Sequence, residues 1–415
     1  METSSKFQKK LNGWSASLLS IAGRTVLVNA CFSSFAIYFM SAFKLPTWVI
    51  KKLDAMRRNF LWHGFQNKKL ILISWDKVCM PKSVGGLGVI DLSTMNEALL
   101  ARWLWIWLSK KESIWSSRNL ILQNKKISTL PLNGQLQPAF MRMESLFSSI
   151  LKFNLGDGKS VPFWHFDWGW GVLKHKYHIL FSYCLDKDIS VSSFSQNVTN
   201  LAAIFRPAIH TSTIALHQLT QVLSHLDSSS LSALPQADTA VWNINTTKLY
   251  STKSLYNFIK KFPKHGSSFK KIWKLKIPPR MVIFLWQMLQ NRIATIDTLK
   301  KRGWVLTNIC YLCRTNEESV QHLFNECLFT QQAKQKLLSS YCPDNIQLLS
   351  TPTTMLLQEK RSIAMNKAME LLAILLYLIW RERCQRIFNE LQHDFHFVVE
   401  HAILEWKILN FKRSH

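Results

Sequence analysis

Apolar residues recur at helical spacing along most of this chain. In the segment 47–62, Val49, Leu53, Met56 and Phe60 repeat every three or four positions, while mainly charged residues occupy the opposite face. The same periodicity and its capping signals predict further helices over residues 95–110, 254–262, 279–290, 295–302 and from 363 to about 411. The pattern therefore predicts a protein that is mainly α-helical.

Patterns typical of strands are few and short. Residues 69–78 are rich in β-branched and aromatic side chains and predict a strand or hairpin arm, which the glycine cluster 85–88 would close with a turn. Residues 154–159 predict a β-turn that leads into an aromatic strand at 163–165. We therefore expect a fold that is mainly α with small β elements.

Breaks in this pattern divide the chain into four predicted parts. Residues 1–110 are mainly helical, and residues 111–238 form a weakly determined middle region or linker with a short β element. Residues 239–335 contain the cysteines described below, and residues 336–415 form a C-terminal helical region. The fold class is thus a multi-part helical chain.

Two apolar runs resemble membrane spans. Residues 25–43 carry no formal charge, but Asn29, Ser33, Ser34 and Ser41 interrupt the run, whereas a span needs about 20 mostly apolar residues. Residues 371–380 are too few to cross a bilayer and predict a buried helix. We therefore expect no membrane partner.

The charge balance of the chain is strongly basic. Lys and Arg number 52 against 25 Asp and Glu, a formal net charge of +27. Such an excess favours an anionic partner, nucleic acid first and an anionic membrane surface second. Eight cysteines are too sparse for a disulfide scaffold, and the chain starts without a signal peptide. We expect an intracellular protein, nuclear or cytoplasmic, and not a secreted one.

The candidate chemistry is concentrated in Cys310, Cys313, His322 and Cys327, which follow the pattern C-x2-C-x8-H-x4-C. Thiolates and imidazoles hold zinc tetrahedrally, and two cysteines separated by two residues can bind one ion from a tight turn. These four ligands would fill every position of the ion, so we predict one structural zinc in a small zinc-stabilised module. The alternative is that the cysteines are core thiols.

The spacing of the last two ligands constrains the local backbone. His322 and Cys327 are five positions apart, which corresponds to about 140° around an α-helix. They cannot share one straight helical face. One of them must therefore lie where a helix ends or unwinds.

Basic residues are concentrated just before the cysteines. Residues 248–302 contain fourteen Lys and Arg and one acidic residue, a net charge of +13. So uneven a run is typical of a surface that follows a phosphate backbone. Trp273, Trp286 and Trp304 would offer stacking faces to unpaired bases, or else belong to the core. The residues predicted to contact RNA or DNA are Lys270, Lys271, Lys274, Lys276, Arg280, Lys300, Lys301, Arg302, Trp273 and Trp304.

Catalytic constellations are absent from the sequence. There is no pair of aspartates on an apolar strand, as two-metal polymerase chemistry requires, and no phosphate-binding loop or nucleophile motif. Asp157, Asp167, Asp186 and Asp188 form a loose group, for which solvated loop acids are the simpler reading and a nuclease centre the alternative. We therefore expect no catalytic residue and no enzyme activity.

Taken together, these motifs resemble the C-terminal part of a plant LINE-type (non-LTR) retrotransposon reverse transcriptase, including its zinc-binding domain. The resemblance covers nearly the whole chain but only the rear of the parent protein. The segments that carry it are 11–14, 18–24, 58–62, 75–79, 85–88, 156–159, 163–164, 269–279, 284–286, 291–295, 299–304, 310–313, 322–327, 379–383 and 387–388.

The resemblance implies roles for the four parts. Residues 1–110 would be the helical, thumb-like region that follows the polymerase palm, and 239–335 the reverse transcriptase zinc-binding domain with its metal set, Cys310, Cys313, His322 and Cys327. By the same resemblance, we expect the palm carboxylates, the endonuclease and the ribonuclease H domain of that family to lie outside this sequence. Polymerase activity therefore does not carry over.

Several functions remain open at this stage. The first is a non-catalytic retroelement-derived fragment that binds one zinc ion and binds RNA or DNA through its basic surface. The second is a zinc-stabilised protein-interaction module, with protein partners that the sequence does not identify. The third is a decayed remnant with no selected activity. Binding that releases counterions weakens steeply with salt, which separates the first from the second.

Overall fold

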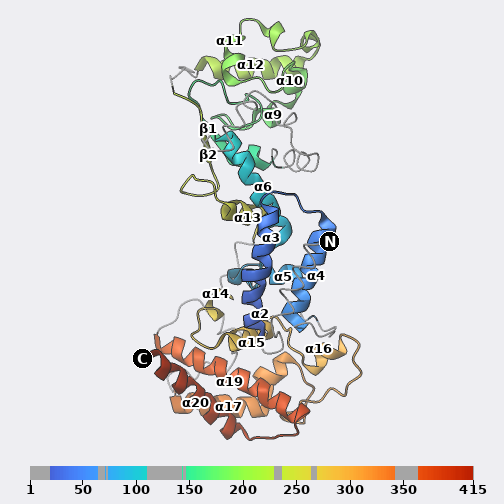
Figure 1. The fold of residues 1–415 in the computed structure, drawn as a ribbon, viewed down its shortest axis with the longest axis vertical. Coiled ribbons are helices and arrows are strands. Elements are labelled where there is room, and N and C mark those ends of the chain that lie inside the picture. The colour runs from blue at the N-terminus through green and yellow to red at the C-terminus, as the bar shows by residue number, and fades with distance from the viewer. Residues whose placement is uncertain are drawn as a thin grey trace. The chain divides into compact units, whose positions relative to one another are not determined.

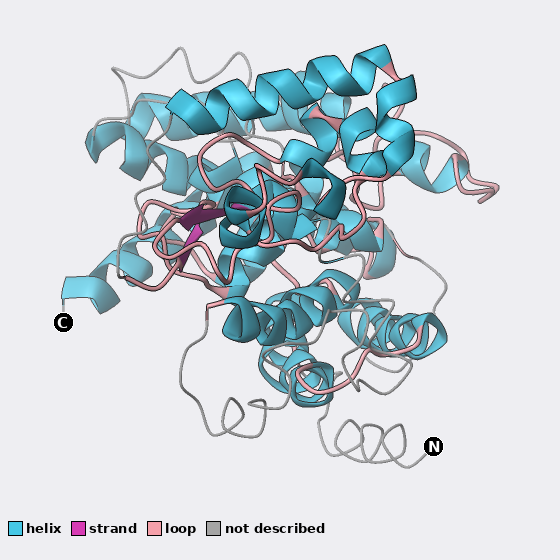
Figure 2. Cartoon of the chain, turned by 90° about the horizontal axis from the view of Figure 1, so that it is seen from above, coloured by secondary structure: helices cyan, strands magenta, loops and turns pink. Residues whose placement is uncertain are grey.

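The computed structural model describes residues 19–63, 71, 73–109, 143, 146–228, 236–262, 269–341 and 363–414. Helices dominate these residues, and β1 (Leu151–Asn154) and β2 (Thr239–Trp242) are the only strands among them (Figure 2). The predicted fold class, mainly α with small β elements, is confirmed.

The described residues form two compact units. The first draws on Met1–Phe35, Lys51–Asp91 and Phe262–His415, and the second on Ala36–Ile50 and Leu92–Lys261. The divisions fall inside or beside α3 (Ser34–Met40), α4 (Thr47–His63) and α6 (Leu92–Leu108). Each unit therefore combines segments that are distant in the sequence.

The first unit is helical throughout its described residues. Its elements besides most of α4 are α2 (Ile21–Leu27), η2 (Val28–Ser33), α5 (Trp75–Val78), η3 (Lys82–Val84), α14 (Phe269–Ile272), α15 (Pro279–Leu289), α16 (Ile296–Lys300), η8 (His322–Glu326), α17 (Leu328–Tyr341), α19 (Ile363–Phe388) and α20 (Phe395–Ser414). Helices α17, α19 and α20 pack against one another, and α15 packs on both α2 and α19 (Figure 1). The core of this unit lies between these helices.

Helix α15 is apolar on nearly every side because it runs through that core. All residues from Met281 to Met288 are buried. Trp286 is fully buried, and its indole N–H donates to the carbonyl oxygen of Gly85 at 2.8 Å. Trp286 is thus a core residue and offers no face to a base, as the alternative reading of the tryptophans allowed.

The glycine cluster forms the predicted turn. Gly85 has φ of +91°, a left-handed conformation that favours glycine. A Cβ on Gly86 would lie 1.9 Å from the carbonyl oxygen of Met80, so no larger residue fits there. The strand predicted for 69–78 is wrong over Trp75–Val78, which form helix α5 after the N-cap residue Ser74; residues 69, 70 and 72 lie outside the described residues. Asp76 in the first turn favours the helix over the β propensity of this short segment, although Ser74 makes no side-chain capping bond.

The second unit has a core rich in aromatic rings. Phe163 stacks on Phe194 with ring centroids 3.8 Å apart, and Trp164 and Trp242 are fully buried. Besides the strands, most of α3 and all of α6, its elements are α9 (Leu173–Lys176), α10 (His178–Tyr183), α11 (Val191–Gln196), η6 (Leu201–Ala203), η7 (Pro207–Thr211), α12 (Thr213–Ser228) and α13 (Thr252–Lys260). The middle of the chain therefore has a hydrophobic core of its own.

The strand of the middle region precedes the predicted turn instead of following it. β1 pairs antiparallel with β2, with Leu151 opposite Trp242. Phe163 and Trp164, predicted as strand residues, lie in turns and are buried. The aromatic strand prediction is wrong because these rings are buried by packing against other aromatic side chains, which needs no regular backbone pairing.

One carboxylate organises the turn after β1. Asp238 accepts hydrogen bonds from the amides of Gly156, Gly158 and Ser160 at 2.8, 2.9 and 3.0 Å. Burial raises the pKa of Asp238, but these hydrogen bonds outweigh it and leave the pKa below its usual value. The Gly156–Lys159 motif is therefore a structural turn held by a residue about eighty positions later.

The apolar run near the start of the chain is helical. Residues Ile21–Met40 are long and apolar enough to cross a membrane by length and composition, and 28% of the window is buried. Core helices of soluble proteins and signal sequences pass the same test, so this is weak evidence for a span.

The core of the first unit also contains a lysine. Lys334, on α17, is 1% exposed, and its ammonium group donates to the carbonyl oxygen of Phe324. Burial lowers the pKa of Lys334 to about 8. An unfolded lysine titrates near 10.5, so the charged form is disfavoured in the folded protein. This penalty is complete below pH 8 and disappears as the pH rises towards 10.5.

We predict that Lys334→Met stabilises the protein at pH 7. The substitution removes a buried charge and keeps most of the apolar stem, so unfolding should cost about 1 to 3 kcal/mol more, after loss of one hydrogen bond. Urea unfolding at pH 7 and pH 10 measures this difference, which should shrink at the higher pH. Lys336→Met, at an exposed site on the same helix, is the control. An equal gain from both variants would contradict the prediction.

Candidate metal centre

The first two ligands, Cys310 and Cys313, lie in a tight turn after α16. The amide of Cys310 donates to the carbonyl oxygen of Asn316 at 2.8 Å, and the amide of Arg314 donates back to the carbonyl oxygen of Cys310 at 2.8 Å. Arg314 has φ of +58°, which reverses the chain direction just after Cys313. The backbone thus forms a closed knuckle with both sulfurs on its inner side.

His322 and Cys327 lie on one π-helical turn. The segment η8 (His322–Glu326) is a π-helix, and the amide of Cys327 donates to the carbonyl oxygen of His322, five residues earlier, at 2.7 Å. Cys327 itself has extended backbone angles, φ of −61° and ψ of 127°. The expectation that one ligand lies where a helix ends or unwinds is confirmed, because the wider turn brings positions i and i+5 together.

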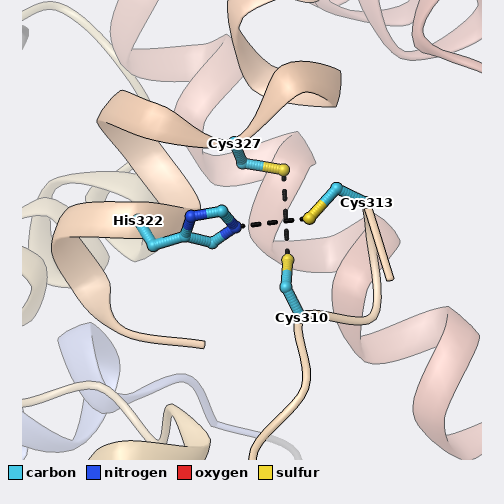
Figure 3. Close-up of side chains that lie close together, drawn as sticks. All are labelled: Cys310, Cys313, His322 and Cys327. Carbon is cyan, nitrogen blue, oxygen red and sulfur yellow. Dashed lines mark hydrogen bonds between the residues drawn. The ribbon is translucent and has the colours of Figure 1, made fainter. Parts of the chain in front are cut away.

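The four ligand atoms converge on a common centre (Figure 3). All lie within 4.8 Å of one another, with 3.9 Å between the sulfurs of Cys310 and Cys327 and 3.4 Å between Cys313 Sγ and His322 Nε2. Tetrahedral zinc with Zn–S bonds of ~2.3 Å places two sulfurs ~3.8 Å apart. This donor set suits one zinc ion, and four protein ligands complete its coordination. The prediction of one zinc ion as cofactor is confirmed by this donor set.

The hydrogen bonds among the four groups shift their pKa values in both directions. The hydrogen bond between Cys310 and Cys327 raises the pKa of Cys310 and lowers that of Cys327. Burial raises the pKa of Cys313, but hydrogen bonds from Thr315 and nearby amides outweigh it and leave the pKa below its usual value. Burial lowers the pKa of His322, yet its hydrogen bonds to Cys313 and Cys310 leave the pKa raised. Zinc binds the thiolate and neutral imidazole forms, so its binding here would release protons.

A buried ion pair joins this segment to helix α19. Arg383 donates to the carboxylate of Glu318 through two nitrogens at 3.0 and 2.5 Å, and both side chains are buried. The same carboxylate accepts the amide of Ile296 at 2.9 Å. The buried charge of Glu318, between the second and third ligands in the sequence, is therefore fully paired.

A second arginine of α19 contacts the cysteine knuckle itself. Arg386 donates to the carbonyl oxygens of Tyr311 and Leu312 at 3.3 and 3.0 Å. These two residues lie between Cys310 and Cys313 in the sequence. Glu382 accepts from Arg386 at 2.8 Å and pairs with His393 at 2.9 Å. Burial raises the pKa of Glu382, but these partners outweigh it and leave the pKa below its usual value.

Sequence reasoning missed these supporting residues. The motif at 379–383 pointed to the C-terminal helix, but nothing in its spacing indicated contact with a turn about seventy residues earlier. One signal was available: Arg383 and Arg386 directly follow the apolar run of the C-terminal helix, and Glu318 lies within the cysteine segment. Buried charges of opposite sign need partners.

The residues predicted to bind nucleic acid are spread over several elements. In the first unit, Lys270, Lys274, Lys276 and Lys300 are exposed, and Lys271 is half-buried. Arg280 is exposed and lies 3.7 Å from Glu405, and Lys301 pairs with Asp297 at 3.2 Å. The basic run as a whole is divided, because Lys248–Lys261 belong to the second unit.

Three of the predicted residues have structural contacts. Arg302 is half-buried and donates to the carbonyl oxygen of Ile71 at 2.6 Å. Trp273 is half-buried against the core, and the ammonium group of Lys82 lies 4.8 Å from its ring centroid. Trp304, by contrast, is 56% exposed. Of the three tryptophans considered from the sequence, Trp304 alone presents most of its ring to solvent.

The loose group of aspartates has a structural explanation. Asp167 accepts from the amides of Gly169 and Gly171 and pairs with Lys152 at 3.1 Å, while Asp157 and Asp186 accept from amides two residues later. Within the described parts of the chain, the Cys3His set is the one group of three or more His, Cys, Asp or Glu side chains placed to hold a metal. These acids therefore stabilise turns.

Comparison with known proteins matches the same region. Residues 250–333, which contain all four ligands, match the family described as zinc-binding in reverse transcriptase. Over 343 residues, 78% of this chain, the sequence is 26% identical to a putative ribonuclease H protein of Arabidopsis thaliana and covers 53% of it. A 68-residue segment, 16% of the chain, is 41% identical to an uncharacterised mitochondrial protein of the same plant and covers 44% of it.

These matches cover only part of each relative. The chain spans about half the length of the curated relatives it matches. The matched domain and the relatives together support a retrotransposon-derived protein.

We predict that Cys313→Ser abolishes zinc binding and unfolds the module around it. Serine is a poor zinc ligand, and the free energy of metal binding contributes directly to folding in such sites. Metal analysis should find about one zinc per chain in the wild type and none in the variant, with lower helix content by circular dichroism. Cys31→Ser, at an exposed cysteine outside the cluster, should keep its zinc. Unchanged metal content in Cys313→Ser would refute the assignment.

We also predict strong coupling between Glu318 and Arg383. Arg383→Met leaves a buried carboxylate without its partner and should cost ~3 to 5 kcal/mol of stability. The double variant Glu318→Gln, Arg383→Met removes both charges and keeps an acceptor for Ile296, so it should lose less than the single variant. Denaturant unfolding of the zinc-loaded proteins measures both. Additive losses would show that the pair is not coupled.

Proposed function

We propose that these residues form a non-catalytic part of a LINE-type (non-LTR) retrotransposon protein of plants. In this proposal the zinc-stabilised module binds RNA or DNA through its basic surface. The protein would act inside the cell, in the nucleus or cytoplasm, without a membrane partner. Zinc holds the fold of the module and takes no part in chemistry.

The unpaired lysines of the module carry the proposal. Lys270, Lys274, Lys276 and Lys300 are exposed, and none has a carboxylate within ion-pair distance among the residues that the structure describes. Exposed lysines on ordinary surfaces are interspersed with acids, whereas a surface that follows phosphates keeps its charges free. The exposed ring of Trp304 adds a stacking face close to Lys300 in the sequence.

The described acids and metal ligands support a role without catalysis. The metal candidate is filled by four protein ligands, and a catalytic zinc site keeps one position open. Of the aspartates that were nuclease candidates, Asp157, Asp167 and Asp186 accept hydrogen bonds from backbone amides, and Asp188 lies 3.4 Å from His165. The relative named as a ribonuclease H protein is matched over about half of its length, so its activity is not transferred to this chain.

A protein-interaction role has one observation in its favour. The segment after α16 exposes a run of apolar side chains, in which Trp304 is 56%, Val305 99% and Leu306 39% exposed. Such a run is typical of a surface that another protein covers. Its binding would respond weakly to salt, which separates it from phosphate binding.

We predict that neutralising Lys270, Lys271 and Lys274 together with glutamine weakens binding to single-stranded RNA. Each lost phosphate contact should reduce the slope of log Kd against log salt by ~0.7, so the slope should fall by up to ~2. Fluorescence anisotropy across a salt series measures both the affinity and the slope.

A matched control removes the same charge elsewhere. Lys159, Lys176 and Lys187 are exposed lysines of the second unit, and their triple glutamine variant should keep the wild-type slope. If both triple variants change binding equally, net charge alone is responsible. If neither variant binds differently from the wild type, the proposed surface is wrong.

A further inference from the structure

A cavity lies in the first unit, where α15, α19 and the start of α2 meet. Its volume is about 480 Å³, within the ~300 to 1,000 Å³ range of pockets that hold small organic ligands. Aromatic and basic side chains line it together: Phe284, Tyr377, Trp380 and Phe388 supply rings, and Arg280 and Arg381 supply charge. The zinc ligands and the exposed lysines described above are not among its lining residues.

One face of α19 supplies six of the fourteen residues that line this cavity. Tyr377, Trp380, Arg381, Cys384 and Phe388 recur at intervals of three and four residues, so they lie on one side of the helix. The neighbouring side carries Glu382, Arg383 and Arg386, which hold the cysteine knuckle. The same helix therefore supports the metal centre and forms a separate pocket.

The wall of the cavity contains the side-chain amide of a glutamine. Gln287 on α15 lines the cavity and is 8% exposed. Its backbone carbonyl accepts two hydrogen bonds, whereas its side-chain amide makes none with another described residue and keeps some contact with solvent. Such an amide is open to a ligand in the cavity, and an amide group is suited to donate to and accept from the edge of a nucleobase.

Free aromatic surface and free charge lie beside it. Phe388 is 75% exposed and has no ring contact with another described residue. Arg381 is exposed and has no acidic partner among the described residues, while Arg280 lies only loosely beside Glu405, at 3.7 Å. A flat ring, an amide and two guanidinium groups in one cavity match the base and the phosphate of a nucleotide.

We propose that this cavity binds one unpaired nucleotide of a single-stranded nucleic acid. The base stacks on Phe388, the amide of Gln287 pairs with its edge, and Arg280 and Arg381 bind the flanking phosphates. This proposal rests on the proposed nucleic-acid binding and adds a specific subsite to it. Arg280 also belongs to the predicted basic surface, so the strand would pass from the exposed lysines into the cavity.

The test uses the zinc-loaded full chain and a short single-stranded RNA with 2-aminopurine at one central position. Stacking on an aromatic ring quenches the fluorescence of this base, while anisotropy of an end label reports binding of the whole strand. For the wild type we expect binding accompanied by quenching. Phe388→Ala should remove the quenching and weaken binding roughly 5- to 100-fold, the effect of losing one stacked base.

Three further variants make the result specific. Phe388→Trp keeps a stacking ring and should restore both quenching and affinity. Gln287→Leu keeps the apolar volume of the wall but removes the amide. With end-labelled RNAs that carry different natural bases at the central position, it should make binding less dependent on the identity of that base. Phe43→Ala, at an exposed ring of the second unit, should behave as the wild type does.

The readouts separate this proposal from the one on which it rests. If the RNA does not bind the wild type at all, both proposals fail. If it binds with a salt slope that depends on Lys270, Lys271 and Lys274, but Phe388→Ala leaves quenching and affinity unchanged, the subsite is refuted and surface binding stands. Circular dichroism and zinc content of each variant identify any loss of fold.

Discussion

Four ligand atoms from one short segment, Cys310–Cys327, must meet within 4.8 Å of one another, and much of the first unit depends on that convergence. Regular helix or turn geometry alone does not achieve it. The chain uses a left-handed residue at Arg314 to close the knuckle and a π-helical turn to bring His322 and Cys327 together. Both conformations are less favourable than regular structure and persist only where the surroundings hold them.

Helix α19 supplies much of that support. Arg383 pairs with Glu318 inside the segment, and Arg386 binds carbonyl groups of the knuckle. The buried ion pair is costly to desolvate, so its value lies in fixing one arrangement of the loop against the helix. Zinc and the two arginines would therefore stabilise the same backbone segment. The ion would do so through the ligand side chains, and the arginines do so through the carbonyl groups and Glu318.

The basic side chains fall into two groups, those with structural contacts and those without them. Arg57, Arg302, Lys334, Arg383 and Arg386 donate to carbonyl groups or carboxylates in the interior or at its edge. Lys270, Lys274, Lys276, Lys300 and Arg381 have no acidic partner among the described residues. Net charge alone does not distinguish the two groups, although only the side chains without an acidic partner are available to an anionic ligand. The surface chemistry is therefore more restricted than a charge of +27 suggests.

The amino-acid sequence by itself determined the helical fold class, the zinc ligands and the break in the helix at His322–Cys327, because each depends on spacing along a local backbone. It could not place Glu318 against Arg383, Asp238 against Gly156, or Gln287 in the wall of a cavity, because these contacts join residues far apart in the chain. The strand predictions for Trp75–Val78 and Phe163–Trp164 were wrong, since an acid in the first helical turn and packing between aromatic rings outweigh β propensity over short segments. Only the tertiary structure decided which charges are buried and which are free, because burial is a property of the packed chain.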